Sequence, residues 1–153
     1  MACAKLRVMP SRNSPPTLKL ADYYMGRDRS HRGDLTRELR ANARDTMRRV
    51  NRLLKRAAKQ VPLGGAGITV SVSSGWRPAT INAAVPGAAK NSKHIQCLAI
   101  DLNDRNGRLD AWCMANLEVL EELGLWLEHP HATPGWCHLQ TQPPRSGNRV
   151  FNP

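Results

Sequence analysis

Residues 92–101, SKHIQCLAID, decide how this chain folds around its most reactive side chains. From position 98 to position 102 large apolar residues alternate with others, which is typical of a β-strand that is buried on one face. Asp101 is then expected on the opposite face of that strand. The small side chain of Ala99 on the same face leaves space beside the carboxylate, and His94 precedes the strand.

A second informative strand is expected at residues 136–140, WCHLQ, with His138 at its centre. Two imidazoles and one carboxylate are a ligand set of the kind that catalytic zinc sites use, and they leave a fourth position for water. A zinc ion in such a site lowers the pKa of its water and polarises a carbonyl group that is to be cleaved. The candidate metal ligands are His94, Asp101 and His138.

The longest predicted element is an amphipathic helix over residues 35–61, in which apolar residues recur at steps of three or four. Asp34 or Thr36 can cap its start, and Pro62 follows its end. The apolar face consists of Leu35, Leu39, Ala43, Met47, Val50, Leu54, Ala57 and Val61. The opposite face carries Arg37, Arg40, Arg44, Arg48, Lys55 and Lys59.

The other predicted elements are short. Strands are expected at residues 68–72 and 125–128, and a helix is expected from Asp110 to Gly124. The tail from residue 141 reads as a loop that packs through its apolar residues. Because helices and strands are mixed without a regular βαβ rhythm, the predicted class is α+β, with a small antiparallel sheet and flanking helices. Residues 1–33 are predicted to be an irregular N-terminal arm, and residues 34–153 a single domain.

The composition is basic: the net charge is +11 and the pI is near 10.4. Such an excess favours polyanionic partners, such as nucleic acid or an anionic cell envelope. No apolar run is long enough to span a bilayer, and the first residues lack the apolar stretch of a signal peptide. Synthesis in the cytosol is therefore expected.

Three segments together resemble the zinc D-Ala-D-Ala carboxypeptidases and related phage endolysins, a group that shares its fold with the hedgehog signalling domain. Residues 92–101 match its Ser-x-His-x-x-Gly-x-Ala-x-Asp signature, except that Cys97 stands at the usual glycine. Residues 74–77, SGWR, followed by Asn82, look like the Ser-Gly-aromatic-Arg segment of this family. Residues 136–139, WCHL, look like the segment that brings the last ligand.

The resemblance implies a zinc peptidase that hydrolyses amide bonds in the peptide stems of peptidoglycan. His94, Asp101 and His138 would bind Zn²⁺. Arg77 would bind a substrate carboxylate or stabilise the oxyanion, and Ser92 would orient the ligand loop or contact the substrate. The absence of a signal peptide fits a phage or prophage endolysin that acts at the bacterial cell wall after release.

One departure from the family pattern concerns the general base. The family usually has an acidic residue three positions before its last histidine ligand, and this chain has Gly135 there. Glu128, at the end of the neighbouring strand, and His131, in the connecting loop, are the candidates to replace it. Glu128 is the favoured catalytic base.

The chain has four cysteines, at positions 3, 97, 113 and 137, and free thiols are expected. Cys97 and Cys137 could join the two histidines in a closed, structural zinc site. Strand alternation argues against this site, because Cys137 should face away from His138.

Two other functions stay open at this stage. Because of Gly135, the protein could be a catalytically inactive zinc-binding structural or virion component with the same fold. Because of the basic helix, it could bind nucleic acid, although no nucleic-acid motif is present and such a partner is not expected.

Overall fold

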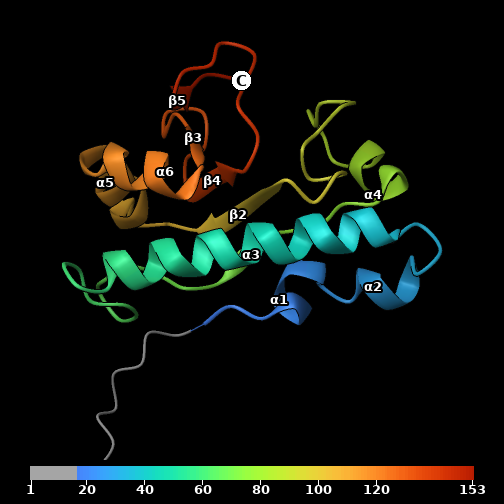
Figure 1. Ribbon diagram of the computed structural model, residues 1–153, viewed down its shortest axis with the longest axis horizontal. Coiled ribbons are helices and arrows are strands. Elements are labelled where there is room, and N and C mark those ends of the chain that lie inside the picture. Colours follow the sequence, from blue (N-terminus) through green and yellow to red (C-terminus); the bar gives the residue numbers. More distant parts are fainter. Residues whose placement is uncertain (1–16) are drawn as a thin grey trace, which may run out of the picture.

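The computed structural model describes residues 17–153, which form one mixed sheet with helices around it (Figure 1). All neighbouring strands pair antiparallel except β5, which runs parallel to β3. The predicted α+β class is confirmed. In the order β1-β2-β4-β3-β5, the strands are Val72–Ser74, Ala99–Asn103, Trp136–Gln140, Trp126–Glu128 and Val150–Phe151.

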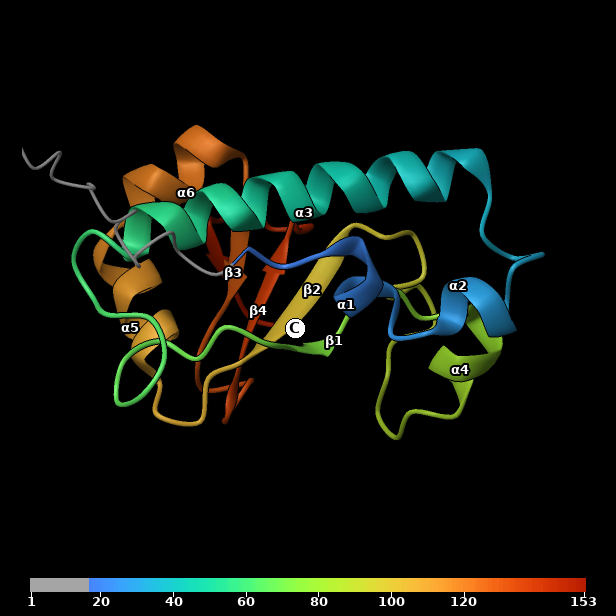
Figure 2. The same ribbon diagram turned by 90° about the horizontal axis from the view of Figure 1, so that it is seen from below.

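Helix α3, Arg37–Ala57, crosses one face of this sheet (Figures 1 and 2). Thr36 caps it, because its side-chain hydroxyl accepts a hydrogen bond from the backbone N–H of Leu39. The predicted amphipathic pattern is confirmed, although the helix is shorter at both ends than residues 35–61. Its buried residues are Ala43, Thr46, Met47, Val50, Leu53, Leu54 and Ala57.

The helix predicted between Asp110 and Gly124 is two helices, α5 at Arg108–Ala115 and α6 at Leu117–Leu123. The break falls at Asn116, whose backbone leaves the helical region. Asp110 is not the cap: the carboxylate of Asp104 accepts hydrogen bonds from the backbone N–H groups of residues 109 and 110. Gly124 ends α6 in the left-handed conformation, as expected. Another short helix, α4, spans Ala79–Ala83.

The strand predicted at residues 68–72 is wrong in its position, since β1 begins only at Val72. The backbone groups of Ile68 bond within a turn instead: its N–H donates to the carbonyl of Pro62, and its carbonyl accepts from Gly64. A backbone group that bonds in a turn is not available for a sheet ladder. Ile68 is nevertheless fully buried in the core.

Residues 17–33 hold two short helices, α1 at Leu20–Tyr24 and α2 at Arg27–Ser30, where an irregular arm was predicted. The side chain of Tyr23 is fully buried, and its hydroxyl donates a hydrogen bond of 2.9 Å to the carbonyl of Ala99 in β2. This segment therefore packs against the strand that carries Asp101. The rest of the predicted arm, residues 1–16, lies outside the described residues, and the division at residue 34 stays a prediction.

The C-terminal tail contributes a strand rather than only a loop. Val150 and Phe151 form β5 beside Leu127 and Glu128 of β3. Arg149, just before β5, holds the tail: its guanidinium stacks 4.3 Å from the ring centre of Trp126. Among residues 17–153, no helix combines the length and the hydrophobicity that a membrane span requires.

We expect Tyr23→Phe to lower the free energy of unfolding by about 1 kcal/mol, because it removes one buried hydrogen bond. Tyr24→Phe is the matched control, since the Tyr24 hydroxyl makes no hydrogen bond to residues 17–153 and the side chain is also buried. Urea unfolding of both variants measures the difference. Equal stability of the two variants would contradict the stabilising role of the Tyr23 contact.

Candidate metal centre

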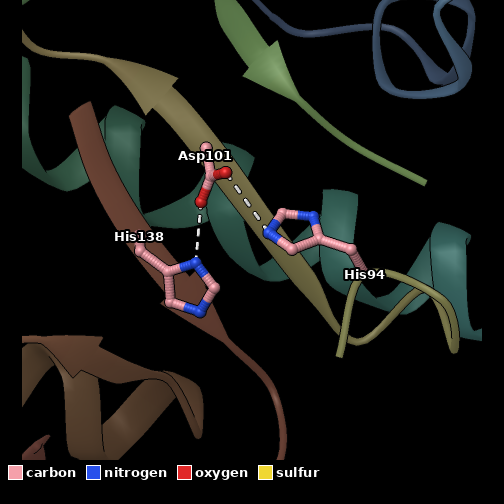
Figure 3. Close-up of side chains that lie close together, drawn as sticks. All are labelled: His94, Asp101 and His138. Carbon is pink, nitrogen blue, oxygen red and sulfur yellow. Dashed lines mark hydrogen bonds and ion pairs between the residues drawn. The ribbon is translucent and has the colours of Figure 1, made fainter. Parts of the chain in front are cut away.

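The register between β2 and β4 places Asp101 directly opposite His138. His94, from the turn before β2, reaches the same point, so that the three side chains meet on one face of the sheet (Figure 3). One nitrogen of each imidazole and one oxygen of the carboxylate all lie within 4.8 Å of one another. The structure thus brings together the three predicted metal ligands; their role as ligands stays a prediction.

The His94 ring is held with one nitrogen turned toward Asp101. Its Nδ1 lies 2.8 Å from the carbonyl oxygen of Gly75. A carbonyl can only accept, so Nδ1 carries the proton and Nε2 is left with a lone pair. Nε2 lies 3.3 Å from Oδ2 of Asp101, is buried, and has no hydrogen-bond donor or acceptor among residues 17–153. A lone pair facing a carboxylate is unfavourable unless a cation binds both, so this arrangement fits a metal ion.

The approach of Gly75 to His94 depends on the absence of a side chain. A Cβ atom at Gly75 would lie 1.9 Å from the carbonyl oxygen of Tyr23. Only glycine fits between the Tyr23 backbone and the His94 ring, which explains the glycine of the SGWR segment. The backbone carbonyl of His94 in turn accepts a hydrogen bond from the N–H of Arg77.

His138 forms a hydrogen bond with the other oxygen of the Asp101 carboxylate. Its Nδ1 lies 2.7 Å from Oδ1 of Asp101. Burial lowers the pKa of His138, but the hydrogen bond and charge of Asp101, together with the charge of Glu128, outweigh burial and raise it. Burial dominates for His94 and lowers its pKa, so this imidazole is neutral, as a metal ligand must be.

The carboxylate of Asp101 lies next to three other side chains of the site, those of His94, His138 and Arg77. Burial alone would raise the pKa of Asp101, but the hydrogen bond with His138 holds the pKa well below its usual range. Nη2 of Arg77 donates to Oδ2 of Asp101 at 3.1 Å, and Nε of Arg77 donates to the hydroxyl of Ser74 at 2.8 Å. Asp101 is thus ionised, and Arg77 is fixed beside it in the positions that the sequence suggested.

The three side chains lie in a cleft of about 470 Å³, which Arg77, Ser92, Glu128 and Phe151 also line. Oε2 of Glu128 lies 3.8 Å from Nδ1 of His138. Burial raises the pKa of Glu128, and the Asp101 charge adds to this effect. Of the two candidate bases, the structure brings Glu128 to the site.

His131 lies elsewhere. Its ring is exposed and stacks on His129, with the ring centres 4.9 Å apart, and it does not line the cleft. Gly135 is also outside the cleft, where its carbonyl accepts a hydrogen bond from the N–H of Asp104. Ser92 accepts a hydrogen bond from the backbone N–H of His94 at 3.3 Å, which suits the orienting role expected of it.

The cysteines do not join the site. Cys97 and Cys137 are fully buried in the hydrophobic core, and the metal-ligand cluster found within residues 17–153 includes neither. Cys97 has a φ of +57°, a left-handed conformation that favours glycine, so the usual glycine of the signature has a physical reason here. Thr46 stabilises this turn by donating to the Cys97 carbonyl at 2.8 Å.

Phe151 is the site residue that the sequence analysis missed. Its ring stands edge-on to that of His138, with the ring centres 6.3 Å apart, and it forms part of the cleft wall. The only indication in the sequence was that two apolar residues, Val150 and Phe151, stand next to each other in an otherwise polar tail. That pair indicated packing but not a strand beside β3.

Comparison with family models gives one finding that bears on this site. A model described as peptidase M15 matches residues 36–127, more than half of the chain. The match includes His94 and Asp101 and ends before Glu128 and His138. Comparisons with curated proteins and with solved structures gave no match.

We expect the protein to bind one zinc ion, and His94→Ala or Asp101→Asn to weaken binding by more than about 100-fold. Changes to groups that only support metal ligands already cost about 10–100-fold. Competition with a chromophoric chelator measures the affinity. His131→Ala is the control, because this exposed histidine lies outside the cluster. Loss of zinc from His131→Ala, or retention by His94→Ala, would contradict the assignment.

Proposed function

Since the chain belongs to the peptidase M15 family of metallopeptidases, we propose that it is a zinc-dependent peptidase that hydrolyses amide bonds in the peptide stems of peptidoglycan. The observation that supports this most directly is the buried, unprotonated Nε2 of His94, which faces Asp101 at the base of the cleft. Glu128 lines the same cleft, with its Oε2 3.8 Å from Nδ1 of His138.

His94, Asp101 and His138 would hold the zinc ion through two imidazole nitrogens and one carboxylate oxygen. When bound, zinc acts as a Lewis acid that makes water more acidic and an amide carbonyl more electrophilic. The hydrogen bond from Nδ1 of His94 to Gly75 keeps Nε2 free of a proton for this purpose. The hydrogen bond between His138 and Asp101 keeps the carboxylate ionised.

Glu128 acts as the general base. Its carboxylate accepts a proton from the attacking water as the new C–O bond forms, and then delivers that proton to the leaving amine nitrogen as the C–N bond breaks. Partial burial raises the pKa of Glu128, which makes its carboxylate a better proton acceptor than an exposed glutamate. A base in the cleft also favours an enzyme over the inactive structural protein that Gly135 left open.

Arg77 binds the charge of the substrate or of the transition state. Two of its N–H donors hold Ser74 and Asp101, and the others stay available to a carboxylate or an oxyanion in the cleft. These two contacts fix the plane of the guanidinium before substrate binds, which is the condition for efficient electrostatic stabilisation. Ser92 keeps the His94 loop in position.

Two reactions on the peptide stems of peptidoglycan fit this proposal: removal of a terminal D-Ala and cleavage within a cross-link. The resemblance of the signature to phage endolysins supports a role in lysis by a phage or prophage, at the cell wall after release from the cytosol. Anionic groups of the envelope would be natural neighbours for a protein with a net charge of +11.

Zinc-loaded protein is expected to release new amine or carboxyl ends from purified peptidoglycan, or from a soluble stem peptide that ends in D-Ala-D-Ala. Glu128→Gln is expected to keep its zinc and to lose about 10²–10⁴-fold in kcat, because the proton acceptor is gone. Zinc content and peptide release are measured on both proteins. The proposal fails if the wild type binds zinc and cleaves nothing, or if Glu128→Gln retains full activity.

Arg77→Lys is expected to lower kcat by about 10²-fold while zinc stays bound, because one ammonium cannot hold both Ser74 and Asp101 and still reach the substrate. Arg27→Lys is the matched control: Arg27 donates to the Trp76 carbonyl and does not line the cleft. Steady-state kinetics on the soluble peptide separate kcat from KM. An unchanged kcat in Arg77→Lys would remove Arg77 from the mechanism.

A further inference from the structure

A row of basic side chains runs along the solvent-facing side of α3 and the turn after it. At 100° per residue these positions fall within an arc of about 80°, which is centred opposite the buried face of the helix. All are exposed. The members of this basic row are Arg37, Arg44, Arg48, Arg52, Lys55 and Lys59.

Most of this charge is not neutralised by the protein. Arg44, Arg52 and Lys55 make no hydrogen bond or ion pair to any residue between 17 and 153, whereas Arg48 pairs with Asp45. With a rise of 1.5 Å per residue, the row is about 33 Å long and its neighbouring charges lie about 5–10 Å apart. A regular line of solvated cations of this length attracts a linear polyanion.

The basic row lies on the other side of the sheet from the cleft. Helix α3 covers one face of the sheet, and the side chains of His94, Asp101 and His138 project from the opposite face (Figures 2 and 3). A polymer bound along α3 would therefore leave the cleft open. Attachment and hydrolysis can take place at the same time.

The row offers charge and no other means of recognition. Among residues 17–153 the exposed large hydrophobic residues are Met25, Val85, Met114 and Leu117. All four lie outside α3, so the helix itself has no exposed apolar edge that could enter a bilayer. The row also has no aromatic ring on which a base could stack.

The asparagines of α3 do not supply base recognition either. The side-chain amide of Asn42 donates to the Gln96 carbonyl, and Asn51 bonds to both backbone groups of Leu18. Both amides are thus used within the fold and are not available to read base edges. The described part of this surface therefore offers contacts to phosphate groups and none that would recognise bases.

We propose that the basic row binds a phosphodiester polymer of the bacterial cell wall and thereby holds the protein on the wall while the cleft acts on nearby peptide stems. The choice of a wall polymer over other polyanions rests on the proposed function. The exposed cations of the basic row are observed independently of that function. Poly(glycerol phosphate) has the required chemistry and is the probe for the test.

The test compares full-length wild type with two triple variants that lose equal charge. Arg44→Gln, Arg52→Gln and Lys55→Gln remove half of the row. Lys90→Gln, Arg105→Gln and Arg145→Gln remove three exposed charges from three separate loops and form the control. Binding to soluble poly(glycerol phosphate) is measured by calorimetry at 50 mM and 200 mM salt.

With the coefficient found for single-stranded polyanions, six contacts predict a loss of affinity of about 300-fold between the two salt concentrations. Three contacts predict a loss of about 20-fold, so the row variant should show the weaker salt dependence and at least about tenfold lower affinity at 50 mM salt. The control variant should match the wild type in salt dependence. Equal weakening of the two variants would overturn the proposal, because net charge alone would then explain binding.

Duplex DNA and phosphatidylglycerol vesicles are titrated in parallel. Tighter binding to either one than to poly(glycerol phosphate) would overturn the assignment to a wall polymer. Hydrolysis of the soluble stem peptide is measured on the wild type and on the row variant and should be the same in both, because the row is distant from the cleft. If none of the proteins cleaves the peptide, the proposed function fails, while the binding data still decide whether the row recognises the polymer.

Discussion

Asp101 and His138 can share a proton or a metal ion because β2 and β4 pair in one particular register. In a sheet, a slip of one residue turns every side chain to the other face. Such a slip would send both residues into the core and bring Ile100 or Cys137 into the cleft. The buried positions of Ile100, Leu102, Cys137 and Leu139 therefore do more than stabilise the sheet, because they also hold the two polar residues on the open face.

The third member of the cluster depends on a close approach of two backbone segments. Gly75 lies against the carbonyl of Tyr23, so that its own carbonyl can orient the His94 ring. Tyr23 also bonds to Ala99 in the strand that carries Asp101. The N-terminal helix α1 thus supports the site from behind, although it contributes no side chain to the cleft.

The two faces of the sheet have different electrostatic roles. On the cleft face, a buried carboxylate is balanced by Arg77 and His138 over distances of about 3 Å. In this partly buried setting such interactions are strong and set the protonation of each group. On the far face, α3 presents exposed cations that are screened by water and salt, and these can act only over a large, multiply charged partner. The same sheet separates the two sets of charges.

The sequence by itself determined the elements whose signals are local. The amphipathic period of α3, the alternation in β2 and β4, and the stop at Gly124 all follow from neighbouring residues, and so does the face of β2 that carries Asp101. Tertiary structure alone decided what depends on distant contacts. Asp104 rather than Asp110 caps α5, because a carboxylate from the preceding loop reaches its N–H groups. Glu128 rather than His131 enters the cleft, and Phe151 joins it, because β3 pairs with both β4 and the C-terminal tail. No local period encodes which distant strand will supply a hydrogen-bonding partner, so these choices are made only when the chain packs.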